Sequence, residues 1–579
     1  MKKSFIYIII FSAGLTACKK DLDLKPFDKL NPSTAFNTEK DLQLYANSLY
    51  NILPTGNEIV RGDALSDYLV GRTPSSYIYG TFNSTMATGW SWGNLRNVNY
   101  FLQNYQQAQL PAEAINHFGG LARFFRAWFY FDMVKQFGDV PWYNKPLDVN
   151  DPDLYKPRDA RTVVMDSVLA DLDFACTNIR SKKDATCSQI TKWVALAFKS
   201  RVCLFEGTYR KYHTNLGLAA SADKWLTEAA NAASELMNAK QYSLHNGSPN
   251  TASYRDLFRN EIPLNDETIL SAVNSKSLRI FNDANWYWTS ATYGGRYSLI
   301  KTFVNTYLNI DGSRFTEQAG FNELPFATEV KNRDLRLQQT IRMGDYTRDG
   351  VIAPPDFTYT YSGYMPLKLT LDAKATDGVA ENYNSLPVIR YAEVLLNYAE
   401  AKAELGAFTA DDWDKTIKLL RTRAGITNTS MPAGADTYLQ QNYYPDITDA
   451  VLLEIRRERG VELVLEGFRY DDLKRWKAGK LLEKQYDGMY VPAMDTPYDL
   501  NEDGKPDVAF VTQVPANKVP GVYYFIIDGQ QFKLSEGNKG RLILMDNLPR
   551  KFEDYKYLYP IPYDEIVLNP ALEQNPQWK

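Results

Sequence analysis

The sequence predicts a mostly α-helical protein, in which a tetratricopeptide-like helical-repeat scaffold carries a loop-rich irregular part with a few short strands. Helical periods recur in pairs along the chain, and glycine or proline separates them. Two intervening regions, about 242–387 and 485–547, lack a sustained helical period. Both are much longer than an ordinary loop, which rarely exceeds about 12–15 residues, so we expect each to have structure of its own.

The amino terminus has the pattern of a bacterial lipoprotein signal. Lys2 and Lys3 begin it, an apolar run follows, and small residues precede Cys18. The apolar run is too short to span a bilayer, which takes about 20 residues. We therefore predict a signal peptide over 1–17, a lipid anchor on Cys18 and a charged tether over 18–30. The mature protein is expected to be extracytoplasmic.

Residues 31–579 are expected to form a single body. The helix expected from 112 to 136 carries too many large apolar side chains for one stripe, so it should be buried nearly all round. Thr268–Val273 is a strand candidate. The helical scaffold is predicted over about 31–241, 388–484 and 548–579, with helices near 38–53, 94–107, 112–136, 162–179, 189–209, 222–240, 388–406, 411–424 and 454–476.

The last of these helical stretches is dense in charge but keeps an apolar stripe. At helical spacing Glu454, Arg457, Glu458 and Glu462 lie opposite that stripe, which predicts a salt-bridged face on a helix packed against the core. Catalytic carboxylates are the alternative, but arginines this close keep carboxylates ionised instead of raising their pKa. Gly467 is expected to separate two helices. The expected local pairs are Arg459 with Glu462, Glu466 with Arg469, and Asp471 with Arg475.

Composition excludes several classes of function. The net charge is −4, with 65 basic and 69 acidic residues and no basic cluster, which argues against nucleic-acid binding. The 3 histidines have no metal-binding spacing, and there is no P-loop, GxGxxG or GxSxG motif. Glycoside hydrolysis needs only two carboxylates, so the sequence leaves it open.

Three cysteines remain after Cys18. Cys203 lies in an apolar helical stretch and is expected to be a buried free thiol. Cys176 and Cys187 flank a polar loop, and in an oxidising compartment they form either a disulfide or two free thiols.

One loop has the spacing of a calcium site. Asp499, Asn501 and Asp503 occupy alternate positions, Gly504 follows at the tight turn, and the Lys505 carbonyl comes next. Phe510 stands where the usual glutamate ligand would be, and Asp507 is its expected substitute. The alternative is a polar turn without metal. No cofactor is expected to be required, and any calcium would be structural.

Aromatic residues form two candidate ligand-binding clusters. Sugars present apolar C–H faces that lie on aromatic rings, while their hydroxyls need polar side chains. In an extended segment, residues two apart project to the same side, so each Trp-x-Trp pair should form a platform. The alternative is that these rings fill junctions between loops and helices. The candidates are Trp90, Trp92, Asn94 and Arg96 in one cluster and Trp286, Tyr287, Trp288, Tyr293 and Arg296 in the other, with Arg72, Tyr77 and Tyr79 as weaker candidates.

Three separated motifs resemble those of the SusD/RagB family of nutrient-capturing surface lipoproteins. They are the run RFFRAWFYF from Arg123 closed by FGDVP from Phe137, the charged stretch from Glu454 to Trp476, and the proline-rich tail from Tyr559. With the lipoprotein signal, the resemblance covers essentially the whole mature chain.

The resemblance implies a glycan-binding protein with no catalytic residues, anchored by lipid on the outer face of the outer membrane. It also implies a SusC-like TonB-dependent transporter as partner, which receives an oligosaccharide or polysaccharide, and a binding face formed largely by the loop-rich part. Two alternatives stay open. The ligand is a peptide or another nutrient, or the protein is a lipid-anchored glycoside hydrolase.

Overall fold

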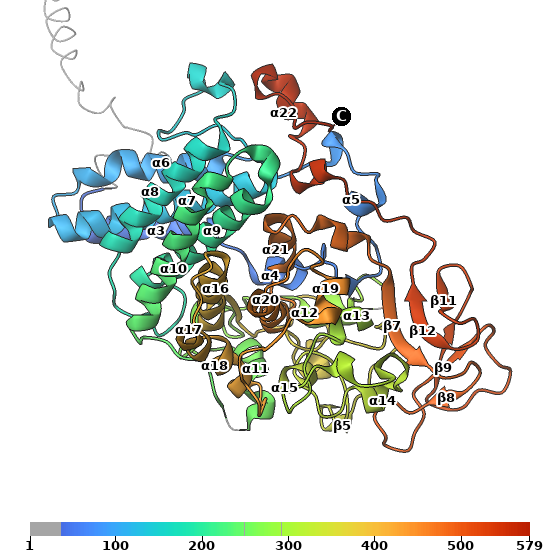
Figure 1. The fold of residues 1–579 in the computed structure, drawn as a ribbon. Helices are drawn as coiled ribbons and strands as arrows, with labels where there is room; N and C mark the ends of the chain where they lie inside the picture. The colour runs from blue at the N-terminus through green and yellow to red at the C-terminus, as the bar shows by residue number, and fades with distance from the viewer. Residues whose placement is uncertain (1–35, 248, 291, 579) are drawn as a thin grey trace, which may run out of the picture.

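The computed structural model describes residues 36–578, except 248 and 291. The predicted signal peptide, Cys18 and the tether over 18–30 lie outside the described residues. Figure 1 shows helices stacked in one half of the molecule, and loops with short strands in the other half. The predicted fold class, mostly helical with a few short strands, is confirmed. No helix within the described ranges is long and apolar enough to cross a membrane.

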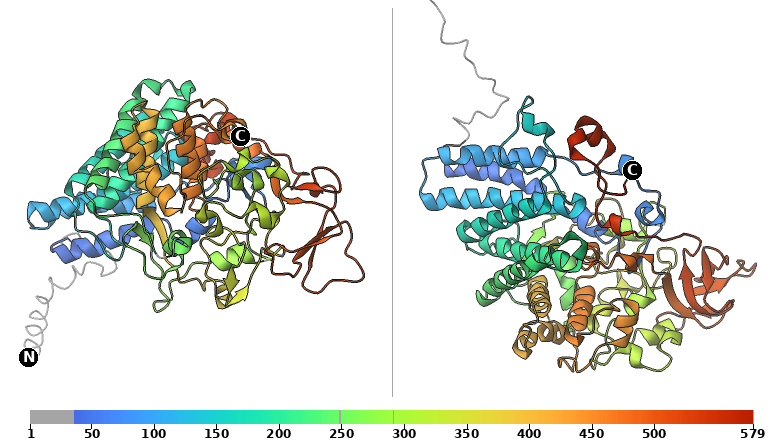
Figure 2. Two further views of the ribbon diagram at one scale, coloured as in Figure 1. Left: turned by 60° about the horizontal axis from the view of Figure 1, so that its bottom comes forward. Right: turned by 45° about the horizontal axis from the view of Figure 1, so that its top comes forward.

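The first helical part forms layers of antiparallel neighbours. Helix α7 packs along α8, α9 packs along α10, and α10 packs against α16 from the second helical part (Figure 2). As predicted, α7 is buried nearly all round. The bounds are α3 (Glu39–Ser48), α4 (Gly56–Arg61), α5 (Ser76–Tyr79), α6 (Gly93–Asn104), α7 (Ala112–Phe137), α8 (Arg161–Asn178), α9 (Lys192–Tyr212) and α10 (Ala222–Asn238).

The end of α7 is tied to the carboxyl-terminal tail. Gly138 ends the helix with a φ of +79°, and a Cβ there would lie 2.7 Å from Leu558. The Asn575 amide donates a hydrogen bond of 2.9 Å to the Phe137 carbonyl. Two motifs that are far apart in sequence therefore meet at one point of the scaffold. The tail contains α22 (Tyr563–Leu568) between the 3-10 turns Asp554–Tyr557 and Pro570–Leu572.

Short helices and strands fill the first loop-rich region. The strand candidate at Thr268 is confirmed, since β2 pairs antiparallel with β6. That pairing also explains why the helix expected from 388 begins only at Tyr391. The elements are α11 (Asn250–Arg259), α12 (Ala284–Thr289), α13 (Lys301–Val304), α14 (Phe326–Glu329) and α15 (Leu335–Gln338), with β1 (Leu69–Val70), β2 (Thr268–Ala272), β3 (Ser298–Leu299), β4 (Thr347–Arg348), β5 (Val351–Ile352) and β6 (Leu386–Arg390).

The second loop-rich region forms two small sheets, with strand orders β11-β12-β7 and β10-β9-β8. The strands are β7 (Tyr486–Val491), β8 (Pro497–Tyr498), β9 (Val508–Val511), β10 (Tyr523–Ile526), β11 (Phe532–Leu534) and β12 (Gly540–Leu544). Figure 1 shows them at the edge of the molecule, away from the helical layers.

The second helical part connects the two halves. The single helix expected over 411–424 is broken at Thr416, whose φ and ψ of −129° and −88° are not helical. The bounds are α16 (Tyr391–Glu404), α17 (Ala410–Lys415), α18 (Ile417–Arg423), α19 (Thr437–Asn442), α20 (Ala450–Glu462) and α21 (Arg469–Arg475).

The cysteine alternatives are resolved in favour of free thiols. Cys176, Cys187 and Cys203 are all buried and unbridged. The Cys187 thiol donates to the Thr268 carbonyl at 3.1 Å, so its sulfur faces β2. Burial raises the pKa of Cys203 well above its usual value, as expected for an inert core thiol.

The predicted ion pairing of the charged face of α20 is confirmed, but this face lies in the protein interior and its partners are not the expected local ones. Glu454, Arg457, Glu458 and Glu462 are all buried. The reason is that α16, α18 and α19 pack around α20 and cover the polar side as well as the apolar one. Helical spacing alone did not reveal this, because it does not show what lies opposite the charges.

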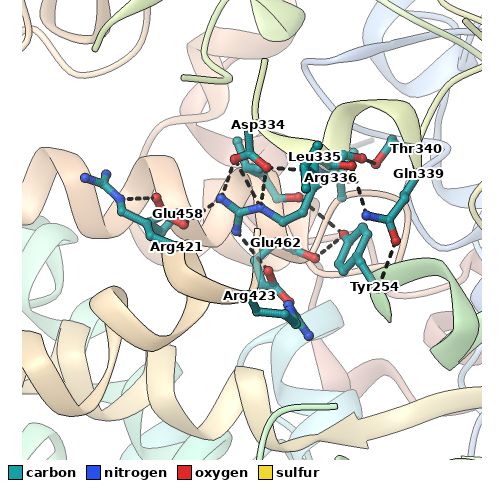
Figure 3. A network of polar contacts seen from close by, with 12 residues as sticks. Tyr254, Asp334, Leu335, Arg336, Gln339, Thr340, Arg421, Arg423, Glu458 and Glu462 are labelled. Atoms are coloured by element: carbon teal, nitrogen blue, oxygen red, sulfur yellow. Dashed lines mark hydrogen bonds and ion pairs between the residues drawn. The ribbon is translucent and has the colours of Figure 1, made fainter. Parts of the chain in front are cut away.

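Glu462 is the centre of a buried ion network. Its carboxylate accepts hydrogen bonds from Arg336 at 2.9 Å and from Arg423 (Figure 3). It accepts a third from Arg390 at 2.5 Å. Arg390 and Arg423 also share Glu267, at 2.9 and 2.8 Å. Burial by itself would raise the pKa of Glu462, but the three guanidinium groups outweigh it and hold this pKa well below its usual range.

The three expected local pairs are replaced by distant partners. Arg459 binds Asp472 at 2.8 Å, Arg469 binds Asp67 at 2.6 Å and Arg475 binds Glu400 at 2.6 Å. Glu466 accepts from Lys368 at 2.6 Å. Gly467 does separate α20 from α21, at a φ of +85°. It also meets Gly62 backbone to backbone, where a Cβ on Gly62 would lie 2.6 Å from the Gly467 Cα.

We expect Glu462→Gln to destabilise the protein by about 3–5 kcal/mol, because it leaves buried arginines without their shared carboxylate. Thermal and denaturant unfolding of the purified protein measures the change. Glu39→Gln is the matched control, since it removes an exposed partner of Arg180 at 2.7 Å, and such pairs contribute about 0–1 kcal/mol. Equal effects of the two substitutions would contradict the assigned role of the buried network.

The pH dependence gives a second readout of the same pair of proteins. A carboxylate with a depressed pKa stabilises the fold above its unfolded pKa, about 4.3 for Glu, and this stabilisation is lost as the pH falls toward the folded pKa. Gln does not titrate, so the stability gap between wild type and Glu462→Gln should narrow below about pH 4.3. A constant gap down to about pH 3 would argue against ionised Glu462.

Candidate ligand-binding site

The tryptophans of the second aromatic cluster do not form an extended platform. They lie on the short helix α12, where residues two apart point to different sides. Trp288 is only 1% exposed, and its indole donates to the Val60 carbonyl at 3.3 Å. Trp286 is half-buried. The prediction of a shared Trp face is therefore wrong, because the segment is helical and one of the rings fills the core.

Two tyrosines, Tyr287 and Tyr297, pack together in the region where the Trp platform was expected. The Tyr287 and Tyr297 rings meet edge to face with centroids 5.4 Å apart, and their hydroxyls lie 3.2 Å apart. The Arg61 guanidinium sits 4.1 Å from the Tyr287 ring centre. Asp283 holds this guanidinium with two hydrogen bonds of 2.9 and 2.5 Å, so α4 and α12 are joined beneath the tyrosines.

A pair of glycines shapes the loop that follows α12. A Cβ on Gly294 would lie 2.4 Å from the Tyr287 carbonyl oxygen, and one on Gly295 would lie 3.0 Å from the rings of both Tyr287 and Tyr297. The Gly295 amide donates to the Tyr287 carbonyl at 2.6 Å, and its carbonyl accepts from the Arg72 amide at 2.7 Å. The close packing therefore requires glycine, and the loop is held firmly against the segment after β1.

Tyr293 stands out from this tightly packed loop. It is 77% exposed, and its amide is tied to the Ser290 hydroxyl at 3.2 Å. An aromatic ring in this position offers a large apolar face to solvent at low conformational cost.

Arg296 and Arg72 border the same region. Arg296 has a φ of +46°, lies 4.3 Å from the Tyr361 ring centre and donates to the Phe357 carbonyl at 3.1 Å. Arg72 is exposed. Burial raises the pKa of Tyr361, while the charges of Arg296 and Arg72 act in the opposite direction. The region thus combines exposed and half-buried tyrosines with guanidinium donors.

A cavity of about 320 Å³ lies between the loop and the segment that includes β1. Its tyrosines are Tyr287, Tyr293, Tyr297 and Tyr486, and the segment from Ala64 to Ile78 supplies small, hydroxyl and aliphatic side chains. We call this cavity, with the residues that line it, the tyrosine cavity. Of the weaker candidates, Arg72 borders it, Tyr77 is buried against Tyr559 with ring centres 4.5 Å apart, and Tyr79 is half-buried.

Sequence reasoning missed Tyr297, Tyr486 and Arg61. Tyr297 follows Gly294, Gly295 and Arg296 directly, so the paired glycines were the available signal for a tightly packed binding loop. Arg61 and Tyr486 are far away in sequence, and nothing local connects them with this loop.

The first aromatic cluster lies elsewhere, around a different cavity. Trp90 is 9% exposed and packs on Phe137 at 5.0 Å, and Trp92 stands at the start of α6. The Trp92 ring is surrounded by Trp90, Phe129 and Tyr143, with ring centres 5.2–5.6 Å away. Trp90 is therefore a core residue, whereas Trp92 is half-buried and lines a cavity of about 410 Å³. Asn94 and Arg96 are exposed, and Arg96 donates to the Leu147 carbonyl at 3.1 Å.

The calcium-like loop connects β8 to β9, and its carboxylates bind its own backbone. Asp499 accepts from the amides of Asn501, Glu502 and Gly504 at 3.1, 2.6 and 2.7 Å. Asp503 accepts from the Lys505 amide at 2.9 Å, and Asp507 from that of Leu500 at 2.8 Å. Burial, with the charges of Asp499 and Asp503, raises the pKa of Asp507 to about 6.

Within residues 36–578 as described, no three or more His, Cys, Asp or Glu side chains are grouped to hold a metal ion. Calcium at Asp499, Asn501, Asp503, Lys505 and Asp507 therefore stays a prediction from spacing. A bound cation would act against the burial and the neighbouring carboxylate charges that raise the pKa of Asp507.

We expect calcium at ten times its Kd to stabilise the protein by about 1.4 kcal/mol if this loop takes the ion. The melting temperature is compared in calcium and in EDTA. Asp499→Asn should remove the difference, whereas Asp311→Asn, in another exposed polar turn where Asp311 accepts from the Ser313 amide at 2.9 Å, should keep it. An identical melting temperature in calcium and EDTA would show that the loop is a polar turn that does not bind calcium.

Comparison with known proteins identifies the fold. A crystal structure of a SusD-like protein from Bacteroides fragilis superposes with a TM-score of 0.70 at 20% identity, covering 96% of this chain and 100% of that one. A SusD-like carbohydrate binding protein of the same species gives 0.68 at 20% identity, covering 93% and 100%. A SusD-like protein of Formosa agariphila is 24% identical over 497 residues, covering 82% of this chain and 91% of its relative.

These structures define the class, a helical scaffold with inserted loop-rich parts. The family model described as the SusD family matches residues 266–578, more than half of the 579 residues. A second model, described as starch-binding associating with outer membrane, matches residues 22–204. The chain belongs to the SusD family, and the resemblance found in its sequence motifs is confirmed. Neither description names a catalytic family.

Proposed function

We propose that this protein is a non-enzymatic lipoprotein of the outer membrane that binds an oligosaccharide or polysaccharide at the cell surface. Cys18 would carry the lipid anchor, and a SusC-like TonB-dependent transporter would receive the glycan. Membership of the SusD family supports the proposal, as do the words starch-binding and associating with outer membrane in the description of the second matching model. One similar structure is that of a putative sugar binding protein from Bacteroides vulgatus, with a TM-score of 0.57.

The observation that carries the proposal is Tyr293. Its ring is 77% exposed, although the loop beneath it is fixed by two glycines and by hydrogen bonds to the Arg72 segment. An aromatic ring has few rotatable bonds, so it loses little entropy when a sugar face stacks on it. Arg72 and the hydroxyls of Thr73 and Ser75 are available nearby to bind sugar hydroxyls.

The lining of the tyrosine cavity supports binding without catalysis. Glycoside hydrolysis needs two carboxyl groups on either side of the scissile bond. The described residues that line this cavity include neither Asp nor Glu. A sugar held there would therefore meet aromatic rings, aliphatic side chains, hydroxyls and backbone groups, which bind it but do not supply the acid and the base.

A peptide or another nutrient remains the alternative ligand. Tyrosine rings and backbone carbonyls also suit peptides, so the lining of the cavity does not distinguish the two ligands. The preference for a glycan rests on the family description. Binding assays that include oligosaccharides and peptides separate the two.

We expect Tyr293→Ala to weaken glycan binding about 10-fold or more, equivalent to at least about 1.4 kcal/mol of lost stacking. Calorimetry with a panel of polysaccharides and their oligosaccharides measures the change. Tyr155→Ala is the control, because Tyr155 is 63% exposed but lies outside the tyrosine cavity. Trp288→Ala is a poor test, since the loss of a buried Trp costs about 3–5 kcal/mol of stability.

Three outcomes would change the proposal. Unchanged affinity in Tyr293→Ala would remove that residue from the binding site. Binding to peptides but to no glycan of the panel would favour the alternative ligand. Release of reducing ends from an oligosaccharide during incubation would show an enzyme.

A further inference from the structure

A cavity of about 630 Å³ lies where the carboxyl-terminal tail meets the helical scaffold. Its walls come from the end of α7, the start of α8, the end of α9 and two parts of the tail, within 554–558 and 573–577. We call it the tail cavity. It shares no lining residue with the tyrosine cavity, so the two are separate places on the molecule.

Three side chains form a stacked column along one wall of the tail cavity. Tyr209 and His213 lie one turn apart at the end of α9, and their rings stack with centres 3.9 Å apart and planes at 17°. The Arg161 guanidinium lies 3.9 Å from the Tyr209 ring centre, and since His213 covers one face of that ring, Arg161 covers the other. Tyr557 meets the His213 ring edge to face at 4.8 Å. The members of the column can therefore present only their edges to the cavity.

The hydrogen bond of His213 determines which ring nitrogen can bind a ligand. Its Nε2 lies 2.7 Å from the Lys474 carbonyl, which can only accept, so Nε2 carries the proton. Burial lowers the pKa of His213 to about 4, so the ring is neutral near pH 7 and Nδ1 keeps its lone pair. His213 is only 3% exposed, yet no residue that the structure describes donates to Nδ1. This nitrogen is an acceptor available to the cavity.

The hydroxyl of Tyr209 is available in the same way. Tyr209 is 4% exposed, and across the described part of the chain its hydroxyl has no hydrogen-bond partner. Such groups inside a protein normally have partners, because an unpaired buried polar group is destabilising. An acceptor and a hydroxyl one helical turn apart are thus left for a molecule that enters the tail cavity.

Arg158 brings positive charge to the cavity without a carboxylate partner. Its guanidinium donates to the Leu572 carbonyl at 2.7 Å, to the Asn575 side-chain oxygen at 2.7 Å and to the Asp139 carbonyl at 3.5 Å. All three acceptors are neutral. Nη2 of Arg158 has no partner among the described residues, so it can donate to a ligand.

The charge of Arg161 is only partly balanced. Arg161 binds Glu206 through Nε at 3.0 Å and Nη2 at 2.6 Å, which leaves Nη1 unused. Arg210 binds the same carboxylate at 2.7 Å. One buried carboxylate therefore serves two guanidinium groups, and an anion beside Arg161 would be stabilised by the remaining charge.

The carboxylates of the lining lie at its exposed rim. Asp139, Asp554 and Glu573 are all exposed, where water solvates their charges and salt screens them. Asp139 also accepts from the Arg161 amide at 2.7 Å, and Asp554 lies 3.6 Å from Lys477. The buried part of the wall, which determines the ligand, thus offers guanidinium donors, one hydroxyl and one imidazole acceptor.

We infer that the tail cavity is a second ligand site, which takes a sugar-sized organic anion whose charged group lies near a hydroxyl. The anionic group binds the unused guanidinium edges of Arg158 and Arg161, as carboxylates and sulfate esters both do. The ligand hydroxyl donates to Nδ1 of His213, which a protonated imidazole could not accept. The inference goes beyond the proposed function, because it needs neither the tyrosine cavity nor Tyr293.

Ligand-observed NMR titration of the purified protein tests the ligand class. D-glucuronate and D-glucose 6-sulfate supply the two kinds of anionic group on a hydroxylated ring, whereas D-glucose lacks the charge and acetate lacks the hydroxyls. We expect at least one of the two anionic sugars to bind with a Kd at least about 10-fold lower than those of glucose and acetate. The one that binds more tightly identifies the anionic group. No binding of either, or equal binding of glucose or of acetate, would overturn the inference.

Tyr209→Phe locates the binding in the tail cavity. It removes an oxygen that binds no described residue, so the melting temperature should not change. We expect the anionic sugar to bind about 5-fold more weakly, as for the loss of one hydrogen bond. Tyr443→Phe is the matched control and should keep wild-type affinity, since Tyr443 is also 4% exposed and its hydroxyl is also unpartnered among the described residues, but it lies outside this cavity. Unchanged affinity in Tyr209→Phe would refute the site.

The two cavities can fail independently in these experiments. Tyr209→Phe should keep wild-type affinity for a neutral glycan, and Tyr293→Ala should keep wild-type affinity for the anionic sugar. Loss of anionic-sugar binding in Tyr293→Ala would place that ligand in the tyrosine cavity and overturn the second site. Absence of neutral-glycan and peptide binding in the wild type would instead contradict the proposed function.

Discussion

The carboxylate of Glu462 holds together parts of the chain that share no local structure. Arg336 comes from the first loop-rich region, Arg390 from the end of β6 and Arg423 from α18. Each would be costly to bury alone, and each is stabilised only when the other segments are in place. Scaffold and loop-rich part are therefore joined by ionic contacts with demanding geometry, in addition to the apolar core. This constraint explains why so much charge is found inside the protein.

The rigidity of the tyrosine cavity follows from the same arrangement. The Tyr254 hydroxyl donates to the Glu462 carbonyl at 2.5 Å and accepts from Lys368, which also reaches Glu466. Gly467 then meets Gly62 at the end of α4, and Arg61 on that helix supports Tyr287. A chain of close contacts thus runs from the buried network to Tyr287, whose carbonyl accepts from the Gly295 amide. The loop that carries Tyr293 is therefore anchored on this fixed core.

Sequence patterns predicted the fold better than the site. The high apolar content predicted α7, and the glycine and proline after it predicted where it ends. The family motifs showed that the first helical part, the second helical part and the tail belong to one fold. The buried position of α20 was missed, because charge at helical spacing looks the same whether water or arginines lie opposite. Trp288 was misplaced for a related reason, since a six-residue helix leaves little periodic signal. Tyr293 was found by composition, whereas its supports Arg61 and Tyr297 depend on tertiary contacts that no local pattern records.

The contact between the end of α7 and the tail has a consequence for the order of events during biogenesis. The Phe137 carbonyl receives its hydrogen bond from Asn575, 438 positions later in the chain. The first helical part is therefore incomplete until the ribosome has made almost the last residue. Translation is therefore nearly finished before the contact that completes the native scaffold can form.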